Sequence, residues 1–252
     1  MLVPMKRNLT IAQLSDIHLG GHYNGRFGTE EHLDVVLSNL RRDEIDLIIV
    51  SGDISEDNEC QLANYKVVRE KLVKTQIPFA VLPGNHDSID MMKTVFTEDE
   101  FNESVLELNN NIVLWNDCPK TGKFDDESLS RLAGHKVVFC HLPLCTVNHV
   151  FMSQYQFGPD AAKLQGKLAQ LGVEHVFCGH VHWPSIVQEA GITTYIDTAV
   201  QAELDPEDSN LHPYAASYGY AIMSMASDGR KIGYNVYEVT YNFQRIIRYP
   251  AD

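Results

Sequence analysis

Several features that mark other protein classes are missing from this chain of 252 residues. No segment approaches the ~20 consecutive apolar residues that cross a bilayer, and residues 1–10 lack the apolar core of a signal peptide. The five cysteines form no Cys-x-x-Cys pair, so we expect reduced thiols rather than a disulfide framework. Together these absences predict a cytoplasmic protein that makes no contact with a membrane.

Positive charge is also scarce. The chain has 20 Lys and Arg against 34 Asp and Glu, which gives a net charge of −14. Surfaces that bind nucleic acids usually need clustered Lys and Arg, so no nucleic-acid duplex is expected as a partner. A phosphate substrate stays compatible with this charge, because bound cations would reverse the local field. The length predicts one domain over residues 1–252.

Apolar segments alternate with amphipathic ones in the first part of the chain. The pattern predicts strands at 9–14, 46–50 and 77–82 and helices at 29–42 and 60–74. An alternation of strands and helices is typical of parallel βαβ units with right-handed crossovers. The sequence therefore indicates the α/β class.

The remainder of the chain predicts a mixture of elements. We expect helices at 98–108 and 159–171, a polar loop at 119–127, and strands at 112–115, 136–140 and 175–178. Five further strands are expected at 185–189, 193–197, 218–226, 231–237 and 241–248, with a turn at 227–229. The C-terminal third should therefore be mostly antiparallel.

Polar motifs stand where many of these strands should end. They are Leu-Ser-Asp-Ile-His at 14–18, Ser-Gly-Asp at 51–53, Gly-Asn-His-Asp at 84–87, His141, and Gly-His-Val-His at 179–182. Open α/β sheets bind ligands at the carboxyl ends of their strands. Oxygen and nitrogen ligands gathered at one edge could hold two metal ions, which suits the cleavage of a phosphate ester by water.

Local geometry and simpler explanations both bear on these motifs. In extended segments, Asp16 and His18 would point the same way, as would His180 and His182. The glycines before Asp53, Asn85 and His180 would allow tight turns near the ions. Taken singly, an aspartate after a strand is usually a turn or cap residue, and a lone His141 is more often structural. The ordered set of five motifs is what favours a metal site.

The motifs, in this order, resemble those of the calcineurin-like metallophosphoesterases. More narrowly, the chain is similar to the branch of class III cyclic nucleotide phosphodiesterases and glycerophosphodiesterases. The motifs span about residues 9–183, and the strand pattern continues to about residue 240. The resemblance implies a four-layer αββα sandwich of two mixed sheets flanked by helices, with a dimetal site at the strand ends.

The resemblance also implies a role for each motif residue. One metal ion would be bound by Asp16, His18 and His182, the second by Asn85, His141 and His180, and Asp53 would bridge them. His86 would hydrogen-bond the phosphate and protonate the leaving oxygen. Mixed oxygen and nitrogen ligands fit Mn, Fe, Zn or Co. Asn85, His86 and Arg26 are candidate substrate contacts, although a solvated loop is the simpler interpretation for Arg26.

The function implied is a metal-dependent phosphoric ester hydrolase that uses in-line attack by metal-bound hydroxide. A phosphodiesterase for cyclic nucleotides or small glycerophosphodiesters is the leading hypothesis. The alternative is a phosphomonoesterase for a nucleotide, sugar phosphate or phosphoprotein. A non-catalytic metal-binding scaffold is less favoured, because no ligand or acid histidine is missing. In that branch the region matching 87–141 can carry dimer contacts, so a homo-oligomer stays open.

Four interpretations concern residues outside the metal set. We expect Asp87 either to orient a histidine or to cap a helix. His149 is interpreted as a surface histidine and Glu203–Asp208 as a solvated loop. The resemblance implies that the segment from Asp197 borders the substrate site.

Overall fold

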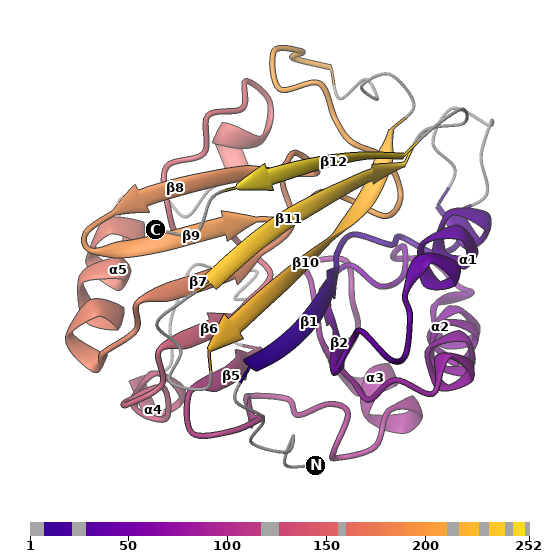
Figure 1. Ribbon diagram of the computed structural model, residues 1–252, viewed down its shortest axis with the longest axis horizontal. Helices are drawn as coiled ribbons and strands as arrows, with labels where there is room; N and C mark the ends of the chain where they lie inside the picture. Colours follow the sequence, from indigo (N-terminus) through magenta and orange to yellow (C-terminus); the bar gives the residue numbers. More distant parts are fainter. Residues whose placement is uncertain are drawn as a thin grey trace.

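The computed structural model describes residues 8–21, 29–116, 126–155, 160–210, 217–226, 232–239 and 244–249. Two six-stranded mixed sheets lie face to face (Figure 1). The first sheet has the strand order β12-β11-β10-β1-β2-β3, and the second has the order β4-β5-β6-β7-β9-β8. The predicted α/β fold with two mixed sheets is confirmed.

The first sheet combines the N-terminal strands with the C-terminal ones. Its members are β1 (Asn8–Leu14), β2 (Leu47–Ser51), β3 (Phe79–Leu82), β10 (Tyr218–Ala226), β11 (Ile232–Val239) and β12 (Gln244–Tyr249). Strands β1, β2 and β3 pair in parallel, whereas β10, β11 and β12 are antiparallel and β10 joins β1. Every residue of β2 is buried, as expected for a strand covered on both faces.

The second sheet is formed by the middle of the chain. Its members are β4 (Val105–Glu107), β5 (Ile112–Trp115), β6 (Val137–Phe139), β7 (His175–Cys178), β8 (Ser185–Glu189) and β9 (Ile192–Ile196). The four inner strands are parallel, and the edge strands β4 and β8 run antiparallel to their neighbours. The antiparallel pairing expected after residue 185 is therefore found for β8 and for β10–β12, but β9 pairs in parallel with β7.

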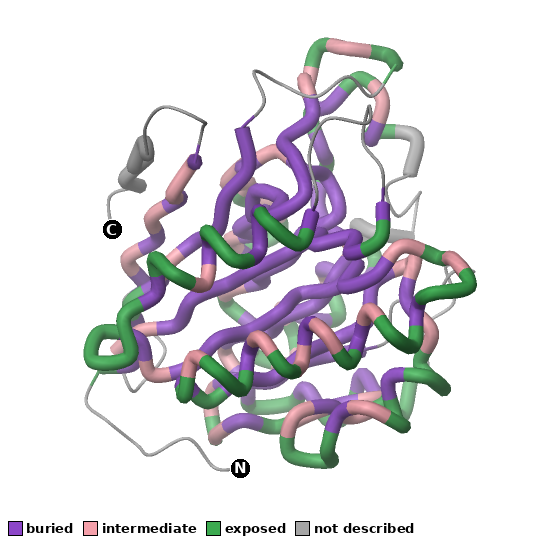
Figure 2. The backbone as a smooth tube through the Cα atoms, turned by 90° about the vertical axis from the view of Figure 1, so that its right-hand side faces the viewer, coloured by how far each residue is buried: buried purple, intermediate pink, exposed green. Residues whose placement is uncertain are grey.

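Helices cover the outer face of each sheet. Helices α1 (Thr29–Asn39), α2 (Gln61–Thr75) and α3 (Ile89–Val95) pack on the first sheet, and α4 (Asp126–Ser130) and α5 (Asp160–Leu171) on the second. A short 3-10 helix, η1 (Met152–Tyr155), precedes α5. Figure 2 shows the buried sheets between helices whose outer sides are exposed.

Three apolar clusters fill the spaces between these layers. Ile48 packs with helix residue Leu72 outside the first sheet, and Val176 packs with Leu168 outside the second. The third cluster lies between the sheets and contains residues of both, such as Ile49 of β2 and Phe139 of β6. Helix, sheet, sheet and helix therefore form the four layers of the predicted αββα sandwich.

Two expectations about local structure are wrong. No helix occupies 98–108: Thr97–Phe101 forms a single turn, and β4 follows. The Asn102 side chain accepts hydrogen bonds from the N–H groups of Ser104 and Val105, which ends helical bonding there. Part of the expected polar loop at 119–127 lies outside the described residues, and its last two residues begin α4. Across the described ranges, no helix has the length and apolar character needed to span a membrane.

Candidate metal centre

The metal motifs meet at one edge of the sandwich. Strands β1, β2 and β3 of one sheet and β6 and β7 of the other all end there. Backbone hydrogen bonds join the loops that follow: the Asp16 N–H donates to Gly52 O at 3.1 Å, and the His18 N–H donates to Asp53 O at 2.8 Å. The Gly179 N–H donates to His141 O at 3.0 Å. The loops of each sheet are therefore fixed to one another at this edge.

Two glycines allow the close approach that the site requires. A Cβ atom on Gly84 would lie 2.1 Å from Asp53 Oδ1, and one on Gly179 would lie 1.7 Å from Ser15 Oγ. Neither separation is sterically possible without movement of the backbone or of a buried side chain. The expectation that glycines let the chain pass close to the site is therefore confirmed.

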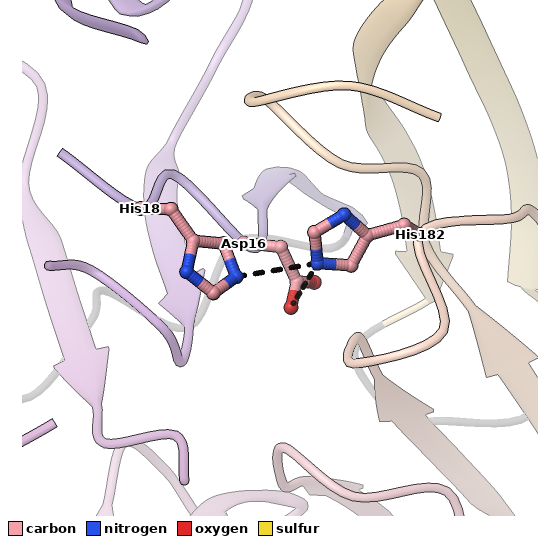
Figure 3. Close-up of side chains that lie close together, drawn as sticks. All are labelled: Asp16, His18 and His182. Atoms are coloured by element: carbon pink, nitrogen blue, oxygen red, sulfur yellow. Dashed lines mark hydrogen bonds and ion pairs between the residues drawn. The ribbon is translucent and has the colours of Figure 1, made fainter. Parts of the chain in front are cut away.

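Asp16, His18 and His182 form the first group of candidate ligands. His182 Nε2 lies 3.3 Å from Asp16 Oδ1 and 3.3 Å from His18 Nε2. Figure 3 shows the Asp16 carboxylate between the two imidazoles, which come from opposite sheets. All three residues are buried. Their ligand atoms lie close enough together to hold one metal ion.

Asp53 connects this group to a second one. Its Oδ2 lies 3.5 Å from His18 Nε2 and 3.3 Å from His141 Nε2. His141 Nε2 is also 3.0 Å from Asn85 Oδ1, and His180 joins Asp53 and His141 in a second set that could hold a metal ion. All seven predicted metal ligands therefore lie at one site, with Asp53 in the position expected of a bridge.

The backbone at these residues is not extended, contrary to the expectation from alternating side chains. Five of the seven candidate ligands have positive φ angles between 46° and 69°: Asp16, His18, Asp53, His180 and His182. This left-handed region is uncommon for residues other than glycine, and such strain gathers at functional sites. Tight left-handed turns, rather than the two-residue period of a strand, therefore bring each pair of side chains together.

Hydrogen bonds to the far side of two imidazoles, His141 and His182, indicate that the site fits a cation. A carbonyl oxygen can only accept, so His141 Nδ1 donates to Ser51 O at 2.8 Å and His182 Nδ1 donates to Ala202 O at 3.1 Å. In the neutral rings this leaves an Nε2 lone pair turned toward carboxylate or amide oxygens. Lone pairs facing lone pairs repel unless a proton or a metal ion lies between them.

Two buried atoms of the site support the same conclusion. Within the described structure, Asp16 Oδ1 and His180 Nε2 are fully buried and make no hydrogen bond. Buried polar atoms are rarely left in this state. The donor set of two carboxylates, an amide oxygen and imidazoles therefore fits first-row divalent metals.

The pKa values of the candidate ligands are shifted by burial and by the charged groups around them. Burial alone would favour the neutral forms, but His182 lowers the pKa of Asp16, and His141 lowers that of Asp53. Burial opposes protonation of His141, yet Asp53 and Asp16 raise its pKa to about 9. Burial and the neighbouring His141 lower the pKa of His180 to about 3. Metal ions would have to displace the proton from His141, so binding should strengthen as pH rises.

Comparison with known proteins decides the family. The family model described as calcineurin-like phosphoesterase matches residues 9–184, which include every motif of the site. The chain belongs to this family. Calcineurin-like phosphoesterases use divalent metal ions, so the protein is a metal-dependent phosphoester hydrolase.

Individual proteins resemble the chain over most of its length. A probable cyclic nucleotide phosphodiesterase of Fibrobacter succinogenes is 24% identical over 80% of this chain and 83% of its own. A probable glycerophosphodiester phosphodiesterase of Arcobacter nitrofigilis is 26% identical over 69% of this chain and 75% of its own. The crystal structure of a dimetal phosphatase from Danio rerio shares the fold, with a TM-score of 0.66, 12% identity, and coverage of 96% and 99% of the two chains.

Glu56 belongs to the site and was missed from the sequence. Its Oε1 accepts a hydrogen bond from His86 Nδ1 at 2.9 Å, and its Oε2 lies 3.3 Å from His18 Nδ1. The hydrogen bond to Oε1 raises the pKa of His86, and the proximity of Oε2 raises that of His18 against the effect of burial. The only signal in the sequence is a carboxylate three residues after Asp53, in a loop where acidic residues are common.

Glu56→Gln is expected to lower kcat/KM by about 10–100-fold, because partners that orient a ligand histidine contribute on that scale. The amide can keep only one of the two imidazoles in place. Steady-state kinetics with metal content determined on the same sample would measure this. Asp57→Asn, on an exposed neighbour in the same loop, is the matched control and should behave like wild type. Equal rates for both variants would contradict the role of Glu56.

Asp87 has neither of the roles expected for it. Its carboxylate accepts hydrogen bonds from the N–H groups of Ile54, Ser55 and Gly84 and from Tyr65 Oη. The cap of α3 is the next residue, Ser88. Asp87 therefore fastens the loop after β2 to the loop after β3, which sequence spacing alone does not reveal.

Two other residues are buried where exposure was expected. His149 is 3% exposed, and its Nδ1 accepts a hydrogen bond from the Met152 N–H. Glu203 is fully buried, although Glu203–Asp208 was interpreted as a solvated loop. Arg26, the candidate phosphate contact, lies outside the described residues.

Asp197 gives a prediction for the pH dependence of stability. Burial raises its pKa well above the ordinary value, despite a hydrogen bond from the Thr198 N–H. The folded chain therefore keeps a proton that the unfolded chain releases near pH 3.9, so stability falls as pH rises from about that value. Asp197→Asn should melt higher than wild type at about pH 8, and the difference should shrink toward about pH 4.

Calorimetry of both proteins in EDTA would test this prediction, since metal ions would alter the field that Asp16 exerts on Asp197. A gain of 1 kcal/mol corresponds to about 2–4 °C in a chain of this size. The exposed variant Asp57→Asn should track wild type. A Tm difference that stays constant with pH would show that the mutation acts only through packing.

Proposed function

We propose that the protein is a dimetal phosphodiesterase for cyclic nucleotides or small glycerophosphodiesters. The observation that supports this most directly is the convergence of seven candidate ligands on one edge, where imidazole nitrogens whose far side is held by a backbone carbonyl face carboxylate and amide oxygens. Asp16, His18 and His182 would hold one ion, Asn85, His141 and His180 the other, and Asp53 both. When bound, the ions would activate water for in-line attack and neutralise the phosphate charge.

The pocket beside the site suits an ester with two substituents. It has a volume of about 620 Å³, and five of the seven candidate ligands line it: His18, Asp53, Asn85, His180 and His182. Phe151, Met152 and Leu204 supply the apolar part of its wall, and Gln201 also lines it. No Lys or Arg is among the described residues that line it. Such a wall favours a substrate whose second substituent is uncharged, rather than one with a second phosphate.

His86 is the residue of this chain that would move a proton in the reaction. Its ring is partly exposed and lines the pocket, and its backbone N–H donates to Asp53 Oδ1 at 2.8 Å. Glu56 holds Nδ1, which leaves Nε2 to face the substrate. With its pKa raised by Glu56, His86 would be protonated before the reaction and would donate that proton to the leaving oxygen.

Paired kinetics on bis-p-nitrophenyl phosphate and p-nitrophenyl phosphate, with Mn²⁺-loaded protein of known metal content, would test the proposal. We expect a higher kcat/KM for the diester and about two ions per chain. Cyclic nucleotides and glycerophosphodiesters would then be compared as substrates. A preference for the monoester would move the assignment to a phosphomonoesterase. Turnover of neither substrate by protein with two ions bound would refute both.

A further inference from the structure

A buried acidic side chain outside the metal motifs, Glu203, connects the two sheets behind the site. Its Oε1 accepts a hydrogen bond from Thr198 Oγ1 at 2.6 Å, and its Oε2 accepts one from the hydroxyl of Ser217. Its N–H donates to Ser217 O at 2.8 Å. Thr198 follows β9 of the second sheet, and Ser217 directly precedes β10 of the first. Glu203 therefore ties the segment between them to both sheets.

The residues on either side of Glu203 both contact His182. The carbonyl of Ala202 accepts a hydrogen bond from His182 Nδ1 at 3.1 Å, and the Leu204 N–H donates to His182 O at 2.9 Å. The same segment reaches the other candidate ligand motif of the first group, because the Gln201 N–H donates to Asp16 O at 3.0 Å. The ring and backbone of His182 are thus fixed by the segment that Glu203 anchors.

We propose that Glu203 is a positioning residue of the metal centre. By fixing residues 202–204, it aims the Ala202 carbonyl at His182 Nδ1 and so keeps the ring turned with Nε2 toward Asp16 and His18. This inference rests on the proposed metal-dependent function of the site. It concerns the first group of ligands, because the described hydrogen bonds of the segment reach Asp16 and His182 rather than His141 or Asn85.

The chemistry of Glu203 supports a positioning role over one in packing. A carboxyl group taken out of water costs free energy that hydroxyl partners only partly offset, so an apolar residue would serve stability better. The two oxygens of a carboxyl group are, however, fixed in one plane, so hydrogen bonds to both of them are directional. With its two oxygens held from two different strand ends, Glu203 sets the direction of the neighbouring carbonyl, which an apolar side chain could not do.

Glu203→Gln and Ser217→Ala test the inference in the full-length chain. In metal-free wild type, ¹⁵N NMR should show the Nδ1–H of His182 protected from exchange with water by its hydrogen bond to Ala202 O, with the signal assigned by comparison with His182→Asn. Both variants should show faster exchange of this Nδ1–H. Titration with Mn²⁺ should then show that one ion binds about 10–100-fold more weakly, while the affinity for the other changes little.

Ser128→Ala is the matched control, since Ser128 is a buried hydroxyl on the far side of the second sheet that accepts a hydrogen bond from Trp115 Nε1. It should lower Tm without changing the exchange of the His182 Nδ1–H or Mn²⁺ affinity. Wild-type exchange and affinity in Ser217→Ala, or in a folded Glu203→Gln, would overturn the positioning role. If wild type itself bound no Mn²⁺, the proposed function would fail before Glu203 is considered.

Discussion

Asp53→Asn should lose at least one bound metal ion and at least ~1,000-fold in kcat/KM, whichever leaving group the substrate carries. Asp53 Oδ2 faces His18 and His141, which belong to different candidate ligand groups. Asparagine keeps the shape of the side chain and tolerates the left-handed backbone, so its effect reports the missing charge rather than a cavity or strain. Elemental analysis and kinetics on one preparation would measure both losses.

The exposed variant Asp57→Asn would control for purification and metal loading. Circular dichroism of Asp53→Asn should match wild type. Asparagine has nearly the same volume as aspartate, so Gly84 can still pack against the side chain at position 53. If Asp53→Asn kept a full complement of metal and a wild-type rate, Asp53 would not be a shared ligand. The assignment of two ions to the two groups would then fail with it.

His86→Ala should keep its metal ions but lose rate in a way that depends on the leaving group. A diester with an alkoxide leaving group needs a proton as the bond breaks, so its kcat should fall by about 100–10,000-fold. A p-nitrophenyl ester, whose leaving group is stable as an anion, should be affected by no more than about 10-fold. Rates on a series of esters with graded leaving groups would show this as a steeper dependence on leaving-group pKa.

The same measurement tests an alternative role for His86, that of a metal ligand. His18, Asp53 and His86 lie close enough together to hold an ion themselves. If His86→Ala lost metal and all substrates slowed by the same factor, His86 would be a ligand rather than an acid. Glu56→Gln separates the roles further, since it should reproduce part of the leaving-group dependence without removing the imidazole.

The parts of the fold that the sequence predicted are those governed by periodic burial. The continuous apolar run of β2 and the spaced apolar residues of α2 predicted their elements to within two residues. The convergence of the candidate ligands was predictable because each motif follows a strand, and parallel strands of one sheet end at one edge. The helix expected at 98–108 failed because Asn102 offers the backbone side-chain hydrogen bonds that compete with helical ones.

The residues that support the site were not predictable in the same way. Glu56 and Asp87 act through partners more than 20 positions away, namely His18, His86 and the loop after β2. Glu203 looks like part of an acidic loop until Thr198 and Ser217 are brought to it by the two sheets. A role that depends on contacts between distant segments leaves no local pattern in composition or spacing.

The left-handed turns at the candidate ligands also bear on how such a protein can change over evolutionary time. Five candidate ligands adopt a left-handed backbone conformation that asparagine and glycine tolerate and β-branched residues do not: Asp16, His18, Asp53, His180 and His182. A single base change converts an aspartate or histidine codon to asparagine. Drift away from catalysis therefore has a route that removes charge and coordination while the loops keep their shape, so descendants could retain the architecture as an inert platform.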